Sequence, residues 1–426
     1  MTSQEPITSP TLKDASKAWL QIGLMSFGGP AAQIALMHKI LVDERKWLSE
    51  KTYLNALSFC MLLPGPEAMQ LATWSGWRLH GVLGGLMAGF SFILPGAIVV
   101  LLLAGIYAEF GATELVQALF LGIKAAVVII VIEALLRISK RALKRKAYWA
   151  LAGLAFAAIF FFDVPFPAII AVAALYGYFI SQREPAAVSA PPPAILRRTA
   201  ITVAVWLAIW LLPLALLWLA LGRDSLLVEV GVLFSKLAVV TFGGAYAVLA
   251  YLGQEVAVSR SWLSANEMID ALGLAETTPG PLILVTEFVA YLAGNKAGGI
   301  WLGIAAVGVG LWTTFAPCFL WVFAGAPFID RLDSAPKLRG ALAAITAAVV
   351  GVILNLGVWF ALHTLFGSVS LQTMGPLSLW TPDLGTFDWR AAVLTLFAGL
   401  LLLRFHLGLG KALVIMAASG WVISQL

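Results

Sequence analysis

Long, uninterrupted apolar runs recur along nearly the whole chain, and they restrict its fold more than any other feature. Many of these runs reach the ~20 residues that a membrane-spanning helix requires. Of the 426 residues, 61% are hydrophobic and 12% are charged, more apolar surface than a soluble protein of this length can bury. The runs are continuously apolar rather than alternating, which predicts helices and not barrel strands. We therefore expect an all-α polytopic membrane protein with roughly ten to thirteen helical segments.

Three short motifs occur twice, and the same distance along the chain separates the two copies of each. The copies of FGG, of R(K/S)WLS and of PGP lie at 27–29 and 242–244, 45–49 and 260–264, and 64–66 and 279–281. Motifs that repeat at one fixed offset indicate a tandem duplication. We expect an N-terminal repeat over 1–181, an exposed proline-rich linker over 182–198, and a C-terminal repeat over 199–426.

The match between the copies continues past a short insertion. Pro95 pairs with Pro317, and the segment 123–128 pairs with 345–350. The residue offset is the same for both pairs, and it is seven residues larger than the offset between the two PGP motifs. Seven extra residues of the second copy therefore lie between its PGP motif and Pro317. We expect them near 295–300.

Charge predicts that the two copies face opposite ways. Six lysines and arginines form a block at 137–146, whereas the equivalent part of the second copy has none between Arg339 and Arg390. The positive-inside rule places the first region in the cytoplasm and the second outside. Three apolar segments, at 147–162, 164–181 and 200–220, separate the copies, and an odd number of crossings also inverts the second copy. We predict inverted-topology repeats in a bacterial inner membrane, with a cytoplasmic N-terminus.

Glycine and proline interrupt the apolar runs at the FGG and PGP motifs of both copies. Proline removes a backbone donor and opens the helical ladder. The helix that starts after the break has free N–H groups and the positive end of its dipole, which together form an anion site. Inverted repeats with broken helices are typical of transporters, whose site lies near the membrane midplane. The structural alternative is that the breaks only kink the helices.

Charged side chains inside apolar segments are expensive and therefore candidates for function. We expect Lys124 and Lys236 to balance the charge of an anion, and Glu67 or Glu276 to carry a coupling proton. Arg78 follows Glu67 by about three turns on the same predicted helix. Internal ion pairs or interfacial positions are the alternative interpretation. The other charges in such segments are Glu133 and Glu287.

Hydroxyl groups precede the breaks, and small residues line some helices. Ser26 and Thr241 are equivalent residues before FGG, and Thr278 precedes the second PGP. Their hydroxyls can donate to an oxyanion or bond back to their own helix. Glycines at 81, 85 and 89, and at 299 and 303, recur at every fourth position, which predicts close helix packing.

The motifs together resemble those of the chromate ion transporter family in its two-domain form. The resemblance rests on FGGP at 27–30, RKWLS at 45–49, PGPE at 64–67, GWRLHG at 76–81 and LPG at 94–96, and on their second-copy counterparts. It implies export of chromate, driven by the proton motive force or by anion exchange, with sulfate as a competing anion. It also implies that the N-terminal motif residues serve transport.

Two other functions remain open at this point. One is a transporter or channel for sulfate or another tetrahedral oxyanion. The other is an intramembrane enzyme acting on lipid-linked substrates, which would need a clustered set of His, Asp and Glu side chains. The four histidines are scattered, so we expect no enzyme, and we expect no cofactor and no metal. We expect the lipid bilayer and no nucleic acid as a partner, and a homodimer is compatible with this pattern.

The candidate substrate-binding residues are Ser26, Gly28, Gly29, Pro30, Pro64, Gly65, Pro66, Glu67, Arg78, Lys124, Lys236, Thr241, Gly243, Gly244, Thr278, Pro279, Gly280 and Pro281.

Overall fold

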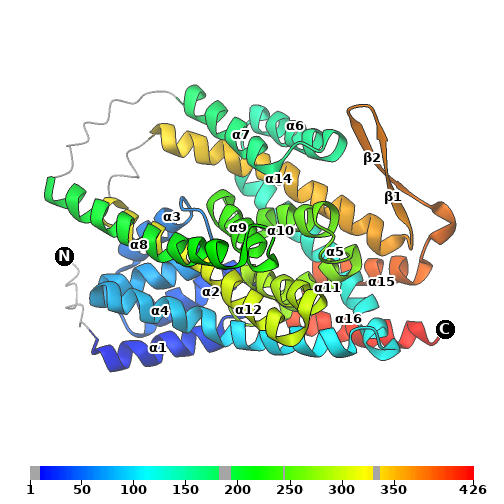
Figure 1. Ribbon diagram of the computed structural model, residues 1–426, viewed down its shortest axis with the longest axis horizontal. Helices are drawn as coiled ribbons and strands as arrows, with labels where there is room; N and C mark the ends of the chain where they lie inside the picture. The colour runs from blue at the N-terminus through cyan, green and yellow to red at the C-terminus, as the bar shows by residue number, and fades with distance from the viewer. Residues whose placement is uncertain (1–9, 182–192, 243–244, 330–335) are drawn as a thin grey trace.

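The computed structural model describes residues 10–181, 193–242, 245–329 and 336–426, and these are almost entirely α-helical (Figure 1). Five of the described helices are long and apolar enough to cross a membrane. The chain is therefore an all-α, multi-pass membrane protein, as predicted.

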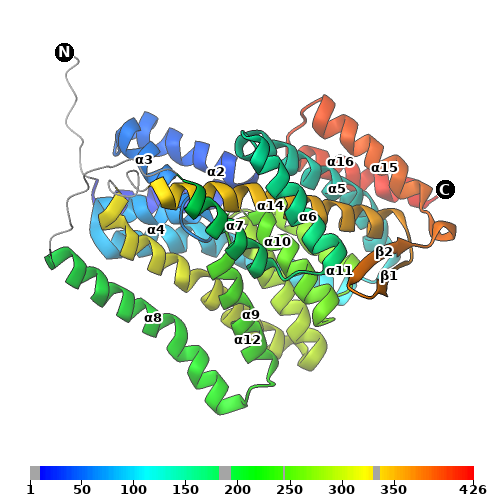
Figure 2. The ribbon, with the colours of Figure 1, turned by 90° about the horizontal axis from the view of Figure 1, so that it is seen from above.

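The elements of the first copy are α1 (Leu12–Met25), α2 (Gly29–His38), the π-helix η1 (Lys39–Glu44), α3 (Glu50–Cys60), α4 (Glu67–Phe110), α5 (Glu114–Ala142), α6 (Lys146–Phe162) and α7 (Phe166–Ile180). The helix α8 (Pro193–Leu221) connects the copies and lies along one edge of the molecule (Figure 2). The second copy comprises α9 (Leu226–Val240), α10 (Ala245–Gly253), the π-helix η2 (Gln254–Ser259), α11 (Ala265–Thr277), the 3-10 turn η3 (Leu282–Leu284), α12 (Val285–Gly325), the 3-10 turn η4 (Ala326–Phe328), α14 (Pro336–Leu365), β1 (Val369–Met374), β2 (Leu377–Pro382), the 3-10 turn η5 (Leu384–Thr386), α15 (Trp389–Gly399), the π-helix η6 (Leu400–Arg404) and α16 (Leu409–Ser424).

The R(K/S)WLS motif builds the same corner in both copies. Each corner follows a π-helix, and the arginine stacks on the tryptophan, with Arg45 4.9 Å from the Trp47 ring centroid and Arg260 5.2 Å from that of Trp262. The final serine of the motif caps the next helix. This motif is therefore accounted for by local structure.

The long elements α4 and α12 are helical hairpins rather than single rods. The backbone leaves helical geometry at His80–Gly81 and at Gly298–Gly299, and Gly81 and Gly299 have positive φ values of 63° and 80°. Gly76 packs against Gly84, so the two legs of α4 run antiparallel. We refer to the legs as the first leg, before the turn, and the second leg, after it.

These turns correct two expectations from the sequence. Gly81 and Gly299 form turns with no neighbour against the position of a Cβ, so they are not packing glycines, whereas Gly85 and Gly89 do pack, against Phe323 and Phe319. The offset from Gly81 to Gly299 exceeds that of the PGP motifs by three, so three of the seven inserted residues precede the second turn. These three correspond to the three-residue turn η3, directly after the PGP motif, and the other four lie after the turn, between Gly299 and Pro317, so the insertion is divided instead of lying at 295–300.

Equivalent helices of the two copies run in opposite directions. On the second leg of α4, Gly85 lies against Phe323 and Gly89 against Phe319 of the second leg of α12. Residue numbers rise on one helix as they fall on the other, so the pair is antiparallel. An inverted repeat requires this relation. In addition, α6 and α7 pack on α14, and α15 and α16 pack on α5, so the end of each copy lies against the other copy.

Two further regions differ from expectation. The predicted linker ends earlier, because α8 already begins at Pro193, and proline is favoured in the first turn of a helix; the part at 182–192 lies outside the described residues. The hairpin of β1 and β2 was not predicted. It is short and mostly exposed, so its strands lack the buried alternation that signals a strand in a sequence.

Candidate functional site at the crossings of the broken helices

Each PGP glycine is hydrogen-bonded to the residue that precedes the FGG motif of the other copy. The backbone N–H of Gly65 donates to the carbonyl oxygen of Thr241 at 2.9 Å, and the N–H of Gly280 donates to the carbonyl oxygen of Ser26 at 2.8 Å. We call the first contact the Gly65 crossing and the second the Gly280 crossing. In each crossing, a PGP glycine of one copy therefore contacts the residue that precedes the FGG motif of the other copy.

The crossings depend on glycine. Gly65 and Gly280 have φ values of 119° and 89°, which side chains with a Cβ rarely adopt. A Cβ on Gly65 would lie 2.8 Å from the Gln70 amide nitrogen and 2.9 Å from the Cys318 sulfur. A Cβ on Gly280 would lie 3.1 Å from Leu284. These backbone segments therefore cannot accept a larger residue without moving.

The residues that follow Pro95 and Pro317 pack on the crossings, and each contacts the PGP motif of the other copy. Gly96, after Pro95, lies directly against the carbonyl of Pro279, and Cys318, after Pro317, lies against Gly65. Both prolines lie inside the second legs of α4 and α12, which remain helical through them. The two crossings therefore flank one antiparallel pair of helices.

A helix or helical turn begins directly after each described break. The helix α2 begins at Gly29 with Pro30 in its first turn, α4 begins after Pro66, and η3 begins after Pro281. None of these three starts has a side-chain cap. Their first N–H groups are thus available to an anion, which is the chemistry expected at a helix N-terminus. Gly243 and Gly244 lie outside the described residues.

Two buried glutamines at the crossings escaped the sequence analysis. The Gln70 amide donates to the carbonyl of Pro64 at 2.7 Å, and the Gln33 amide donates to the carbonyls of Gly280 at 2.6 Å and Ser26 at 3.3 Å. Both side chains are almost fully buried. Uncharged polar residues in otherwise apolar helices were the available signal, because such residues need a partner when buried.

The predicted hydroxyl donors bond back to their own helices. Ser26 donates to the carbonyl of Ile22 at 2.6 Å, Thr241 to that of Leu237, and Thr278 to that of Ala275 at 3.0 Å. This is the common role of Ser and Thr near a helix end. Their oxygen atoms shape the break rather than present a free proton to a ligand.

Of the predicted charges, Glu67 follows the glycine of the Gly65 crossing by two residues. It is the first residue of α4 and is partly exposed. Arg78 is exposed near the hairpin turn, about 16 Å further along the first leg. The structure therefore does not bring Arg78 to the crossing beside Glu67.

The two candidate lysines occupy different environments. Lys124 is paired with Asp270 at 3.5 Å and also reaches Asn266 at 3.3 Å, while the Tyr107 hydroxyl donates to Asp270 at 2.6 Å. This is an ion pair between copies, the alternative interpretation given above. Lys236 is exposed on α9.

One hollow of the described structure reaches a crossing. It has a volume of about 690 Å³ and is lined by Phe27 and Gly28 of the first break, by Glu276 and Thr277 before the second PGP, and by the start of α16, including Lys411. Lys411 is the cation in this lining. The sequence analysis did not select it, because its proximity to Gly28 depends on how α16 packs.

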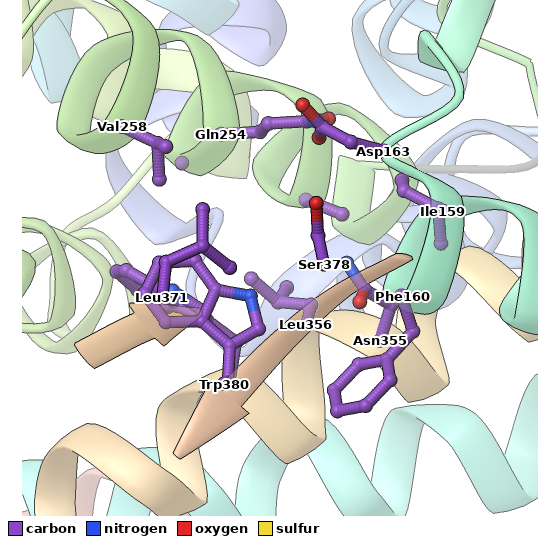
Figure 3. Close-up of a pocket in the computed structure, with 13 residues that line it drawn as sticks. Ile159, Phe160, Asp163, Gln254, Val258, Asn355, Leu356, Leu371, Ser378 and Trp380 are labelled. Atoms are coloured by element: carbon purple, nitrogen blue, oxygen red, sulfur yellow. The ribbon is translucent and has the colours of Figure 1, made fainter. Parts of the chain in front are cut away.

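A second cavity lies under the β-hairpin (Figure 3). Trp380 and Ser378 of β2 line it together with Asp163 and Gln254, and the Gln254 amide donates to Asp163 at 2.5 Å. Its volume of about 40 Å³ has room for a few water molecules only. The hollow beside Gly28 is therefore the better candidate for a path to the crossings.

Comparison with known proteins finds relatives over most of the chain. The family model described as chromate transporter matches residues 14–178 and 228–423. A chromate transport protein of Pseudomonas aeruginosa is 33% identical over 350 residues, which cover 79% of this chain and 77% of the relative. A chromate transport protein of Cupriavidus metallidurans is 28% identical over 349 residues, covering 81% and 82%. An uncharacterized transporter of Methanocaldococcus jannaschii is 26% identical over 362 residues, covering 84% and 86%. No solved structure matches the chain. With both of its halves matched by the family model, the chain belongs to the chromate transporter family.

Proposed function

We propose that this protein exports chromate across the bacterial inner membrane and that the anion binds at the two crossings. The observation that carries this proposal is the reciprocal contact of Gly65 with Thr241 and of Gly280 with Ser26. It gathers uncapped helix starts from both copies around one pair of helices. A tetrahedral oxyanion offers several acceptors, and backbone N–H groups at helix starts supply donors for them without a buried cation.

Transport outward follows from the charge of the substrate. An interior-negative potential favours the exit of an anion by ~2.3 kcal/mol per charge per 100 mV. A dianion leaving alone would gain about twice that amount; import of protons in exchange would add to it, whereas an anion entering in exchange would offset the electrical gain. We place the basic block at 137–146 and the N-terminus in the cytoplasm, because positive loops are retained there.

Access from the cytoplasm is proposed to run through the hollow that contains Lys411. A cation at an open mouth raises the local concentration of anions and steers them inward. The hollow ends at Gly28 and Thr277, which flank the Gly280 crossing.

Everted membrane vesicles provide the test. Vesicles that contain the protein should accumulate radiolabelled chromate against its gradient when energised, and vesicles without it should not. Sulfate should compete, since it has the same tetrahedral geometry and charge. Accumulation of sulfate with no transport of chromate would instead support the sulfate transporter, and chromate accumulation that never exceeds the ratio set by the membrane potential would support passive flow through a channel.

A further inference from the structure

Glu287 is a buried carboxyl group for which the proposed binding site has no use. Its residue is 1% exposed, and neither carboxyl oxygen has a hydrogen-bond partner among the described residues. It lies in the first turn of α12, shortly after the Gly280 crossing. An ionised carboxylate without a partner is very costly in an apolar interior, so this group is uncharged in the conformation described.

Glu287 lies near the Gly280 crossing and on the side of the first leg that faces the second leg of α12. It lies one helical turn before Ala290 and Tyr291, which pack against Gly310 and Gly303 of the second leg. Glu287 therefore shares the face of the first leg that looks toward the second leg. Along the chain it follows the Gly280 crossing directly.

The second leg of α12, on the side that faces the first leg, contains a second buried group without a partner. Thr314 lies one turn after Gly310, is 2% exposed, and its hydroxyl has no hydrogen bond in the described structure. Cys318 lies one further turn along the same face, and its sulfur faces Gly65. The stripe formed by Gly310, Thr314 and Cys318 thus leads from the level of Glu287 to the Gly65 crossing.

Among the described residues, no charged neighbour neutralises Glu287. The titratable groups on the elements packed against α12 are Tyr107, Glu109, Glu67, Arg78 and His80 on α4, Glu229 and Lys236 on α9, Glu267, Asp270 and Glu276 on α11, and Arg197 and Arg198 on α8. None of them forms an ion pair or hydrogen bond with Glu287 in the described structure; Asp270, for example, is bound to Lys124 and Tyr107. Lys296 of α12 itself is paired with Glu267 at 2.6 Å.

We propose that Glu287 is the coupling carboxyl of the transporter, which takes up a proton from the external side and releases it to the cytoplasm as the anion leaves. The inference rests on the proposed function and adds the coupling ion and its site, in place of Glu67 or Glu276, the carriers expected from the sequence. The step is one proton bound to and released from one carboxyl oxygen, with no other bond made or broken.

Purified protein in liposomes at a clamped membrane potential tests this proposal. The rate of wild-type chromate export should rise by about tenfold for each unit by which the external pH is lowered, over the range in which a one-proton step limits the rate. Glu287→Gln, which fixes the neutral state, should abolish this slope, and Glu287→Asp should retain it at a lower rate. Glu109→Gln, an equal charge change at an exposed residue near the end of α4, should behave as wild type. An unchanged slope in Glu287→Gln, or dependence on sodium in place of pH, would overturn the proposal.

An infrared difference spectrum separates this inference from the proposed function. The spectrum of Glu287→Gln is subtracted from that of the wild-type protein. The difference should contain the carbonyl band of one protonated carboxyl group, whether or not chromate is transported. Absence of chromate transport by the wild-type protein in liposomes would refute the proposed function, while the infrared band would still report on Glu287. Absence of that band in the wild-type protein would refute the inference.

Discussion

The Gly65 and Gly280 crossings have nearly the same backbone and different side chains. In both, a glycine with positive φ donates its N–H to the residue before the FGG motif of the other copy. The neighbours differ: Gln70 and Cys318 surround Gly65, whereas Gln33 and Gly96 adjoin Gly280. The two copies have kept the backbone contact and not the side chains. We therefore assign the proposed anion binding to the shared backbone, and we expect the differences between the two copies to lie in the side chains.

The equivalent helices α5 and α14 also share a backbone and differ in their side chains, here at their C-terminal ends. One face of α5 carries Glu133, Arg137 and Arg141 at successive turns, whereas Asn355, Trp359 and His363 occupy the equivalent positions of α14. The aromatic end is covered by the β-hairpin, where Trp380 lies 6.5 Å from Trp359 between ring centroids. The charged end carries the basic block.

The largest expected effect concerns the side of the membrane that each of these ends occupies. A reporter fused after Arg145 should be cytoplasmic, and one fused after Leu371, in β1, should be external. The outcome is all or none for each fusion, measured with paired reporters that are active on opposite sides. Two fusions on the same side would show that the copies are not inverted, and the comparison would fail.

A smaller effect is expected where the copies differ by one buried ion pair. Lys124 and Asp270 pair in one half, whereas Thr346 and Asn55 occupy the equivalent positions of the other half. Asp270→Asn should lower the free energy of unfolding by about 3–5 kcal/mol, because it leaves the Lys124 charge buried and unpaired. Thermal unfolding in detergent measures this change.

The double variant Lys124→Thr with Asp270→Asn copies the other half and provides the matched control. It should recover most of the lost stability, because neither charge remains. If the double variant transported no chromate although it folded, the ion pair would have a role in transport that the other half lacks.

The buried glutamines should matter less. Gln33→Val introduces the residue found at the equivalent position of the second copy, Val248. It removes the donor to the Gly280 carbonyl, and leaving that acceptor unsatisfied should cost about 1–3 kcal/mol of stability. Unfolding in detergent measures the loss, and Gln33→Met, which keeps the length but removes the donor, should lose a similar amount. No loss in either variant would show that water replaces the bond.

The smallest effect is expected at the mouth of the hollow. Lys411→Gln should raise the KM for chromate by roughly twofold to fivefold at low ionic strength and leave the maximal rate unchanged, because an exposed cation acts by steering. The difference should shrink in high salt, where exposed charges are screened. Lys236→Gln, an exposed lysine outside this hollow, is the control. Equal effects of both variants would assign the result to net charge alone.

The sequence predicted those parts of the fold that depend on local pattern or on repetition. Apolar runs predicted the helices, and the fixed offset of the PGP and FGG motifs predicted that breaks would recur in the second copy. Proline at the breaks also predicted where α2 and α4 begin.

The rest depends on contacts between distant segments. That Gly81 forms a turn follows from how the two legs of α4 fold together, and that Gly85 is a packing contact follows from how α4 meets α12, although both are glycines in one regular series. The partner of Lys124 lies far along the chain in the other copy, so no local pattern identifies it. Only once the chain is folded does Glu287 differ from the other acidic residues, because it alone among the intramembrane carboxyl groups predicted has both oxygens buried and unpaired in the described structure.

Binding of radiolabelled chromate to the purified protein, compared between crossing variants and side-chain variants, tests the central claim most directly. If the backbone of both crossings holds the anion, Gly65→Val and Gly280→Val should each abolish binding while the protein still inserts and accumulates, since both distort a backbone that requires glycine. The packing variant Gly85→Ala should lower the folded yield but bind normally per molecule, and Arg78→Ala and Lys236→Ala should still bind. Binding that survives both valine substitutions but is lost in Arg78→Ala or Lys236→Ala would contradict the account, because side-chain charge would then hold the anion.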